Sequence, residues 1–271
     1  MTACYRYDGS FEGFLCALAA CLESGGAEAD FLRPGDKGEA GLFTGDPREI
    51  ATERGTALRF RERFVAAVSR EAFATLRYAF HSEAAGIERL LWRYVVLGLE
   101  QGRRVQRMLA QEPVCSVHRL ARRVAHEAHR FTGFVRFREV AWPAAGEWGN
   151  EQGRATGTPA VPLMYARIEP EVDILAFIAP YFRERLGDRP WMIHDLRRSA
   201  LALCHRGAWR LVSGVSLARQ PGLTADEESC SRLWRSYFQH MAIPERHNPR
   251  LQQSLVPLRF RAHLVEFDGA G

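Results

Sequence analysis

The segment from Ser116 to Val140, SVHRLARRVAHEAHRFTGFVRFREV, limits the possible folds more than any other stretch of the sequence. Its apolar residues recur at steps of three and four, which is the spacing of one face of an α-helix. This apolar face consists of Val117, Leu120, Val124, Ala128 and Phe131. The opposite face is basic and consists of Arg119, Arg122, Arg123, His126, His129 and Arg130. We therefore predict a helix with one side packed in a core and one cationic side that suits an anion.

A change of period follows this helix. After Gly133 the apolar residues alternate, so that Val135 and Phe137 share one face while Arg136 and Arg138 share the other. We expect Gly133 to permit a turn from the helix directly into a strand.

The residues before this segment predict a mainly helical part. Cys4–Tyr7 alternates in polarity and predicts a short strand, and Ser10 is placed to cap a helix over Phe11–Leu22. Residues 23–55 are rich in Gly, Asp and Glu, so we expect an acidic surface loop. Three helices follow, over residues 58–80, 82–108 and 116–133.

The residues after 133 predict a mainly antiparallel sheet. A strand at Pro162–Ile168 should pair with the preceding strand across a Gly- and Pro-rich loop, Ala141–Thr158. Asp173–Leu186 predicts a helix that Pro180 kinks or shortens. Three further runs separated by tight turns predict an antiparallel meander, over Trp191–Leu196, Ser199–His205 and Ala208–Val212.

The C-terminal part predicts helices. The longest covers Thr224–His240, and its apolar side carries Leu233, Trp234, Tyr237 and Phe238. Asn248-Pro249 and Pro257 are placed to start two shorter helices. Together these patterns predict an α+β fold in which a helical block packs with a sheet of about five strands and C-terminal helices. We expect a single domain over residues 1–271, with the mainly helical part in 1–133 and the sheet and C-terminal helices in 134–271.

Composition places the chain among water-soluble proteins of a reducing compartment. No apolar run approaches the roughly 20 residues that span a bilayer, so we predict no membrane association. The six cysteines are scattered and form no CxxC pair, which favours free thiols and a cytoplasmic location.

Charge is concentrated in the middle of the chain. Residues 59–138 hold 16 arginines and 7 glutamates, a net charge of +9, although the whole chain carries only +5. Arginine pairs bidentately with phosphate, as a nucleic-acid surface requires. Coding bias toward GC-rich codons is an alternative reason for the preference for arginine over lysine, but it does not explain the clustering.

The familiar catalytic motifs are absent. His126-Glu127-Ala128-His129 resembles the start of HExxH, yet Arg130 stands where the second zinc-binding histidine should be. The sequence also lacks GxSxG, GxGxxG and the P-loop pattern. We therefore predict no metal site and no cofactor.

Scattered polar residues remain as candidates for catalysis or phosphate binding. The acid–base candidates are Glu127, Asp173, His194 and Asp195. Each is alternatively a helix cap, turn former or ion-pair partner, and Asp173 suits a helix N-terminus. Arg197 and Arg198 either grip a phosphate beside a His194–Asp195 unit or form a charged hairpin tip. Ahead of a C-terminal helix, Arg246 and Arg250 either bind phosphate or belong to a solvated capping loop.

Five segments carry a resemblance to a known family. They are YRYDGSFEGFL at Tyr5–Leu15, EAHRFTGFVRF at Glu127–Phe137, YARIEP at Tyr165–Pro170, APYFRERLGDRPWMIHD at Ala179–Asp195 and ERHNPRLQQSLVPLRF at Glu245–Phe260. In these segments, and in their order, the chain resembles a bacterial family of DNA-metabolism proteins. Its members are paired in the genome with a radical-SAM protein, and related domains are fused to a uracil-DNA-glycosylase-like domain. Val172 departs from the pattern, because many relatives have a histidine or an aromatic residue after the YARIEP segment.

The resemblance implies a role in DNA repair or modification, with a radical-SAM protein as partner. Together with the basic helix, it favours a DNA-binding accessory protein. One alternative is an enzyme that acts on damaged DNA or a nucleotide. A second alternative is a protein scaffold, with Trp142 and Trp148 as its contact.

Overall fold

The structure is a computed structural model that describes residues 3–25, 28–35, 46–142, 161–215, 217, 221–241, 243 and 248–267. Arg246, Trp148 and almost all of the predicted loop Ala141–Thr158 lie outside these residues. The contacts of the chain group into two compact units, Met1–His126 and Glu127–Gly271. We refer to them as the N-terminal unit and the C-terminal unit. The boundary falls a few residues before the predicted division at residue 133, and the single domain itself stays a prediction.

A small parallel sheet begins the N-terminal unit. Strand β1 (Ala3–Arg6) lies between β2 (Ala29–Leu32) and β3 (Arg48–Glu49) and pairs in parallel with both. The acidic surface loop predicted over residues 23–55 therefore contains two short strands. All four residues of β2 are buried, and Asp30 within it is paired with Arg89 of a later helix. Asp30 is buried in the strand because Arg89, which is distant in the sequence, pairs with it. The acidic composition of residues 23–55 therefore gave no sign of a buried strand.

Helix α1 (Phe11–Glu23) forms as its cap predicts. The Ser10 hydroxyl accepts a hydrogen bond from the Gly13 amide at 2.9 Å, so the first turn is closed by its own side chain. The buried face of α1 packs in an aromatic-rich core, where the rings of Phe14 and Phe80 stack at 5.2 Å and those of Phe14 and Phe31 meet edge-on.

The helix predicted over residues 58–80 is two helices, α2 (Arg54–Ala67) and α3 (Arg70–Phe80). The break falls at Val68 and Ser69, because the Ser69 hydroxyl accepts a hydrogen bond from the Ala72 amide and starts a new helix. The next predicted helix is also shorter. It forms α4 (Ile87–Gln101), and the left-handed backbone of Gly102 separates it from the 3-10 helix η1 (Gly102–Arg107).

Helix α5 (Val114–Phe134) confirms the strongest sequence pattern. Val117, Val124, Ala128 and Phe131 of the apolar face are buried. The expected turn at Gly133 is wrong, because the Val135 amide still donates to the Phe131 carbonyl at 3.0 Å. The helix therefore continues through the glycine, and the next strand, β4 (Arg138–Trp142), starts later than predicted.

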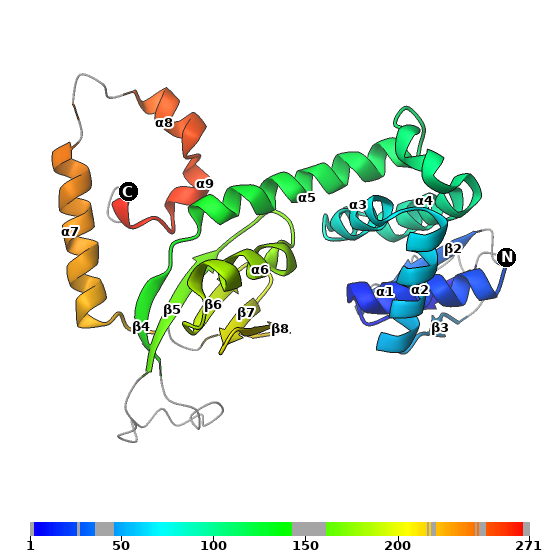
Figure 1. The fold of residues 1–271 in the computed structure, drawn as a ribbon, viewed down its shortest axis with the longest axis horizontal. Helices are drawn as coiled ribbons and strands as arrows, with labels where there is room; N and C mark the ends of the chain where they lie inside the picture. Colours follow the sequence, from blue (N-terminus) through cyan, green and yellow to red (C-terminus); the bar gives the residue numbers. More distant parts are fainter. Residues whose placement is uncertain are drawn as a thin grey trace. The chain divides into compact units, whose positions relative to one another are not determined.

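The five-stranded sheet of the C-terminal unit has the order β4-β5-β6-β7-β8. The last four strands are β5 (Val161–Ile168), β6 (Trp191–Asp195), β7 (Ala200–His205) and β8 (Ala208–Ser213). All neighbours pair antiparallel except β5 and β6, which are parallel. A parallel pair needs a crossover, and α6 (Leu175–Leu186) provides it and packs on β6, β7 and β8 (Figure 1). The predicted mainly antiparallel sheet of about five strands is confirmed.

The C-terminal helices are α7 (Ala225–Met241), α8 (Pro249–Leu255) and α9 (Leu258–Arg261), followed by the 3-10 helix η3 (Val265–Phe267). Asn248 caps α8 as predicted, since its side chain accepts a hydrogen bond from the Leu251 amide at 3.0 Å. The fold is therefore α+β, as expected. Among the helices that can be described, none is both long and apolar enough to cross a membrane. The six cysteines are free thiols.

Candidate nucleic-acid interface

The basic face of α5 is exposed over most of its length. Arg119, Arg122, Arg123 and His126 are exposed in the N-terminal unit, and His129 is exposed in the C-terminal unit. They are exposed because the apolar residues on the other face of the helix pack in the core, as expected for an amphipathic helix. The helix thus presents guanidinium groups at a repeating spacing to solvent.

Arg130 differs from the other basic residues of α5. It is half-buried, and its guanidinium lies over the Phe260 ring at 4.8 Å from the centroid. Arg259 lies over the same ring at 4.6 Å. Arg130 is therefore engaged in packing, and the exposed stripe consists of the other five residues.

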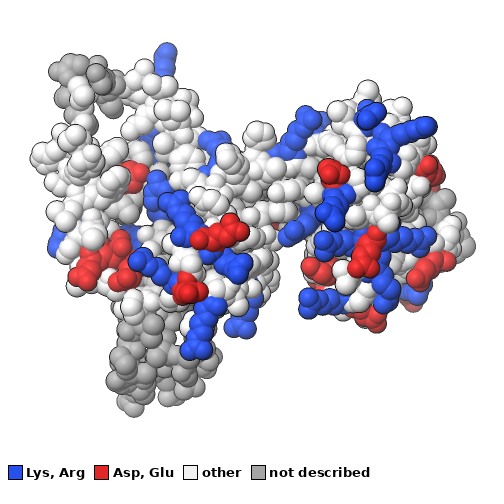
Figure 2. Space-filling model, viewed as in Figure 1, with Lys and Arg blue, Asp and Glu red and all other residues white. Residues whose placement is uncertain are grey.

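Charges elsewhere are mixed. Figure 2 shows Lys and Arg side chains interspersed with Asp and Glu on the visible face of each unit, without one uninterrupted basic area. The net positive charge of residues 59–138 therefore does not by itself produce one continuous basic surface. The arginines of α5 therefore carry the candidate interface.

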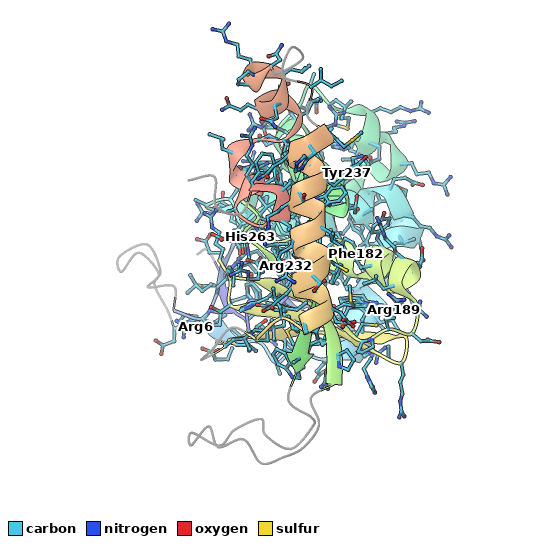
Figure 3. The ribbon with its side chains drawn as sticks, turned by 90° about the vertical axis from the view of Figure 1, so that its left-hand side faces the viewer. Arg6, Phe182, Arg189, Arg232, Tyr237 and His263 are labelled. Atoms are coloured by element: carbon cyan, nitrogen blue, oxygen red, sulfur yellow. The ribbon has the colours of Figure 1, made fainter. Side chains whose placement is uncertain are left out.

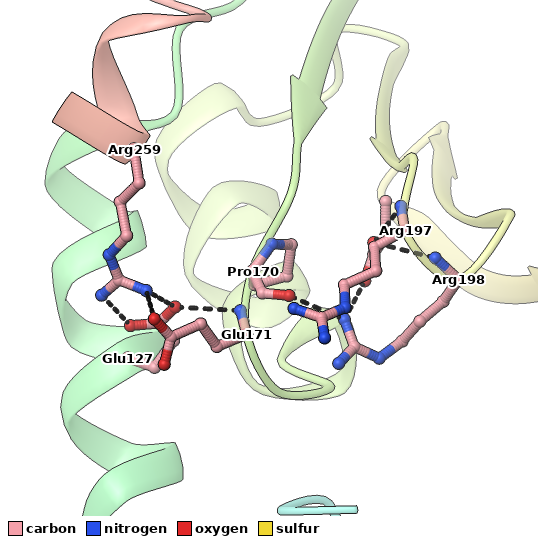
Figure 4. Close-up of polar contacts among 7 residues, drawn as sticks. Glu127, Pro170, Glu171, Arg197, Arg198 and Arg259 are labelled. Carbon is pink, nitrogen blue, oxygen red and sulfur yellow. Dashed lines mark hydrogen bonds and ion pairs between the residues drawn. The ribbon is translucent and has the colours of Figure 1, made fainter.

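Glu127, the first acid–base candidate, is buried and paired. Its two carboxylate oxygens accept hydrogen bonds from the Arg259 guanidinium at 2.8 and 2.7 Å. The Glu171 amide donates to Glu127 at 3.2 Å, and the Glu171 carboxylate lies 3.0 Å from Arg259 (Figure 4). This network links α5, α9 and the connection between β5 and α6. Because the carboxylate is committed to these partners, the geometry favours a structural role for Glu127.

The predicted His194–Asp195 unit does not form. The two residues follow each other on β6, so their side chains point to opposite faces of the sheet. The His194 Nδ1 atom lies 3.0 Å from the Tyr165 hydroxyl. Burial lowers the pKa of the His194 imidazole, and the nearby Arg167 lowers it further.

Asp195 organises the turn after β6. Its Oδ1 atom accepts hydrogen bonds from the amides of Arg197 and Arg198, and its Oδ2 atom accepts one from the Arg198 guanidinium at 3.0 Å. Arg198 also donates to the Pro170 carbonyl at 3.1 Å (Figure 4). Burial raises the pKa of the Asp195 carboxyl, and Arg198 opposes this effect. Of the two arginines predicted to grip a phosphate, only Arg197 has an exposed side chain.

The remaining candidate residues are Asp173, Arg246 and Arg250. Asp173 is half-buried just before α6, in the region where we expected an acidic residue to suit the helix N-terminus. Arg250 is exposed in the first turn of α8, and Arg246 lies outside the described residues. Among the residues that the structure describes, no three His, Cys, Asp or Glu side chains could hold a metal ion together. The candidates therefore separate into the exposed stripe of α5, a set of paired, largely buried groups, and two isolated exposed arginines, Arg197 and Arg250.

One further feature escaped the sequence patterns. A cavity of about 550 Å³ in the N-terminal unit is lined by residues of α2, α3 and η1 and by Ser69 between the two helices. It carries three arginines, Arg70, Arg103 and Arg107. The arginines of η1 are visible in the sequence, but nothing local to them indicates that Arg70 lies beside them.

The fold and this surface define an α+β protein with an exposed basic helix. The model of the DUF4130 family, a domain of unknown function, matches residues 85–266. This match covers more than half of the chain, so the chain belongs to that family. The matched range runs from just before α4 into η3 and includes all of α5. Neither a curated protein nor a solved structure matches the chain.

Proposed function

We propose that this chain is a DNA-binding accessory protein of a DNA repair or modification system. The observation that carries the proposal is the row of exposed arginines on one face of α5, at Arg119, Arg122 and Arg123. Guanidinium groups pair with phosphate oxygens, and such contacts position a protein on DNA without reading its sequence. The resemblance to DNA-metabolism proteins supports the same class of partner.

Three of the four acid–base candidates favour binding over catalysis. Glu127 is held by Arg259, and Asp195 is held by Arg198 and two turn amides. His194 is buried against Tyr165. A general acid or base must reach the proton that it transfers, and these groups are committed within the protein. An accessory role therefore fits the geometry better than an enzyme acting on damaged DNA or a nucleotide.

Titration with single- and double-stranded DNA at several salt concentrations tests this proposal. We expect affinity to fall steeply with salt, because phosphate contacts release counterions. The double substitution Arg122→Glu plus Arg123→Glu should weaken binding to all sequences alike and reduce the slope of log K against log salt by about two.

A matched charge change provides the control. Arg189 and Arg210 are exposed in the C-terminal unit, outside the stripe, and Arg189 is labelled in Figure 3. Arg189→Glu plus Arg210→Glu changes the net charge equally and should retain most of the affinity. Equal loss in both double variants, or no binding at low salt, would contradict the proposed interface. Turnover on a panel of lesions, lost in a folded Glu127→Gln variant, would instead support the enzyme alternative.

A protein partner is a second candidate, and α7 favours it. Leu233, Tyr237 and Met241 follow one another at four-residue steps and are 70%, 56% and 61% exposed. Tyr237 stacks on Trp234 at 5.8 Å, and Tyr237 is labelled on α7 in Figure 3. An exposed apolar helix face suits the groove of another protein. The resemblance implies a radical-SAM protein, and copurification with it that survives high salt and nuclease treatment would support this role.

A further inference from the structure

The cavity of the N-terminal unit has a strongly cationic lining. It is formed by Val65, Ser69, Arg70, Glu71, Arg103, Gln106 and Arg107. Its charged side chains are three arginines and one glutamate, a net charge of +2. Its volume of about 550 Å³ lies in the range of pockets that hold small organic ligands.

The arginines of this cavity are available to a ligand. Arg70, Arg103 and Arg107 are exposed, and within the described part of the chain none of them forms an ion pair at salt-bridge distance. Arg103 and Arg107 lie four residues apart on η1, whereas Arg70 begins α3. Three like charges repel one another, so a bound anion would relieve their repulsion.

Two neutral side chains shape the same cavity. The Gln106 amide donates to the buried Tyr94 hydroxyl at 2.8 Å, which fixes the direction of the side chain. The Ser69 hydroxyl caps α3, whose N-terminus adds partial positive charge. Glu71 is the one acidic group. Its pKa is lowered by hydrogen bonds from its own amide and from Ser69, with a contribution from Arg103 and Arg70.

We propose that this cavity is a binding site for a phosphate monoester of nucleotide size. The net charge of +2 matches a phosphate dianion, and guanidinium forks bind phosphate oxygens bidentately. The volume exceeds that of inorganic phosphate, so the organic part of the ligand fills the remainder. The Glu71 carboxylate accepts hydrogen bonds from hydroxyl or amino groups of that part. The cavity shares no residue with the exposed stripe of α5.

Calorimetric titration of the full chain with deoxyadenosine 5′-monophosphate and with deoxyadenosine tests the site. We expect the nucleotide to bind and the nucleoside not to bind. Arg103→Gln plus Arg107→Gln should weaken nucleotide binding at least about 10-fold, as expected for lost charge-assisted hydrogen bonds. Glu71→Gln should strengthen binding several-fold, because it removes the one negative charge of the lining and keeps an amide oxygen that accepts the same hydrogen bonds.

Arg104→Gln is the matched control, since Arg104 is exposed on the same η1 helix but does not line the cavity. It should leave nucleotide binding unchanged. Equal binding of nucleotide and nucleoside, no binding of either, or equal weakening by Arg104→Gln would overturn the proposal.

Comparing an oligonucleotide with and without a 5′ phosphate shows whether the bound phosphate belongs to a DNA end or to a free nucleotide. An affinity gain from the 5′ phosphate that disappears in the Arg103→Gln plus Arg107→Gln variant identifies a DNA end as the ligand. Nucleotide binding without that gain identifies a free nucleotide. Arg122→Glu plus Arg123→Glu should not change nucleotide binding, so failure of the α5 interface and failure of this cavity are distinguishable.

Discussion

Two glycines that both lie in helices have opposite environments. A Cβ atom at Gly13 of α1 would lie 2.1 Å from the Asp8 Oδ1 atom and 2.7 Å from the Thr52 hydroxyl. Asp8 accepts hydrogen bonds from both Ser10 and Thr52, so the side chain of residue 13 is excluded by the network that starts α1. A Cβ atom at Gly133 of α5 would meet nothing within 4 Å.

Substitution by alanine should therefore change stability in opposite directions. Gly13→Ala should lower the free energy of unfolding by about 1–3 kcal/mol, because it forces Asp8 and Thr52 apart. Gly133→Ala should raise it by up to about 1 kcal/mol, because alanine loses less conformational entropy in a helix. Urea unfolding of both variants measures the two changes. A stabilising Gly13→Ala would show that the Asp8 network is not closed as described.

At the scale of elements, side-chain contacts hold α9 against α5 and against the connection between β5 and α6. Arg259 pairs with Glu127 and Glu171, and the neighbouring Phe260 ring packs on Phe131 and Phe134 with centroids 5.0 and 4.4 Å apart. A helix of four residues is too short to be stable alone. Its position therefore depends on these side chains.

Arg259→Met should loosen this attachment. We expect a loss of about 2–3 kcal/mol in the free energy of unfolding, because Glu127 stays buried without its charged donor. Glu127→Gln should lose a similar amount, and the double variant should lose less than the sum, since the residues contact each other. Arg189→Met, at an exposed arginine outside the network, should change stability by less than about 0.5 kcal/mol. Additive losses would contradict the pairing.

At the scale of the molecule, each of the two units contains an apolar cluster of buried residues. One large apolar cluster contains only residues of the N-terminal unit, from Tyr5 to Ala121. Another consists of Val140, Tyr165, Met192 and Leu201 in the C-terminal unit. Helix α5 contributes residues to both units. Whether the two units unfold together can therefore be measured on the whole chain.

Hydrogen exchange should localise the effect of a core substitution. Leu76→Ala and Ile193→Ala each remove a fully buried side chain, one from each unit, and each should cost about 2–5 kcal/mol. We expect amide protection to fall mainly in the unit that carries the substitution, because proteins open locally in contiguous cooperative units. Equal loss of protection throughout both units would instead indicate one cooperative domain, as the sequence predicts.

The sequence by itself determined the features that depend on neighbouring residues. The amphipathic pattern of α5, the caps at Ser10 and Asn248, and the meander of β6 to β8 all formed as predicted. Helical spacing, capping hydrogen bonds and tight turns act over a few residues, so the local sequence contains their cause. The misplaced turn at Gly133 shows the limit, because a glycine permits a turn without requiring one.

Only the tertiary structure decided which distant groups meet. Strand β2 is buried because it pairs with β1, and Glu127 is paired because Arg259 lies beside it despite a separation of 132 residues. The cavity arginines come from α3 and η1, and the paired groups around Asp195 come from two connections, the one after β5 and the one after β6. Burial, ion pairing and the lining of a cavity depend on chain packing, which no local period encodes.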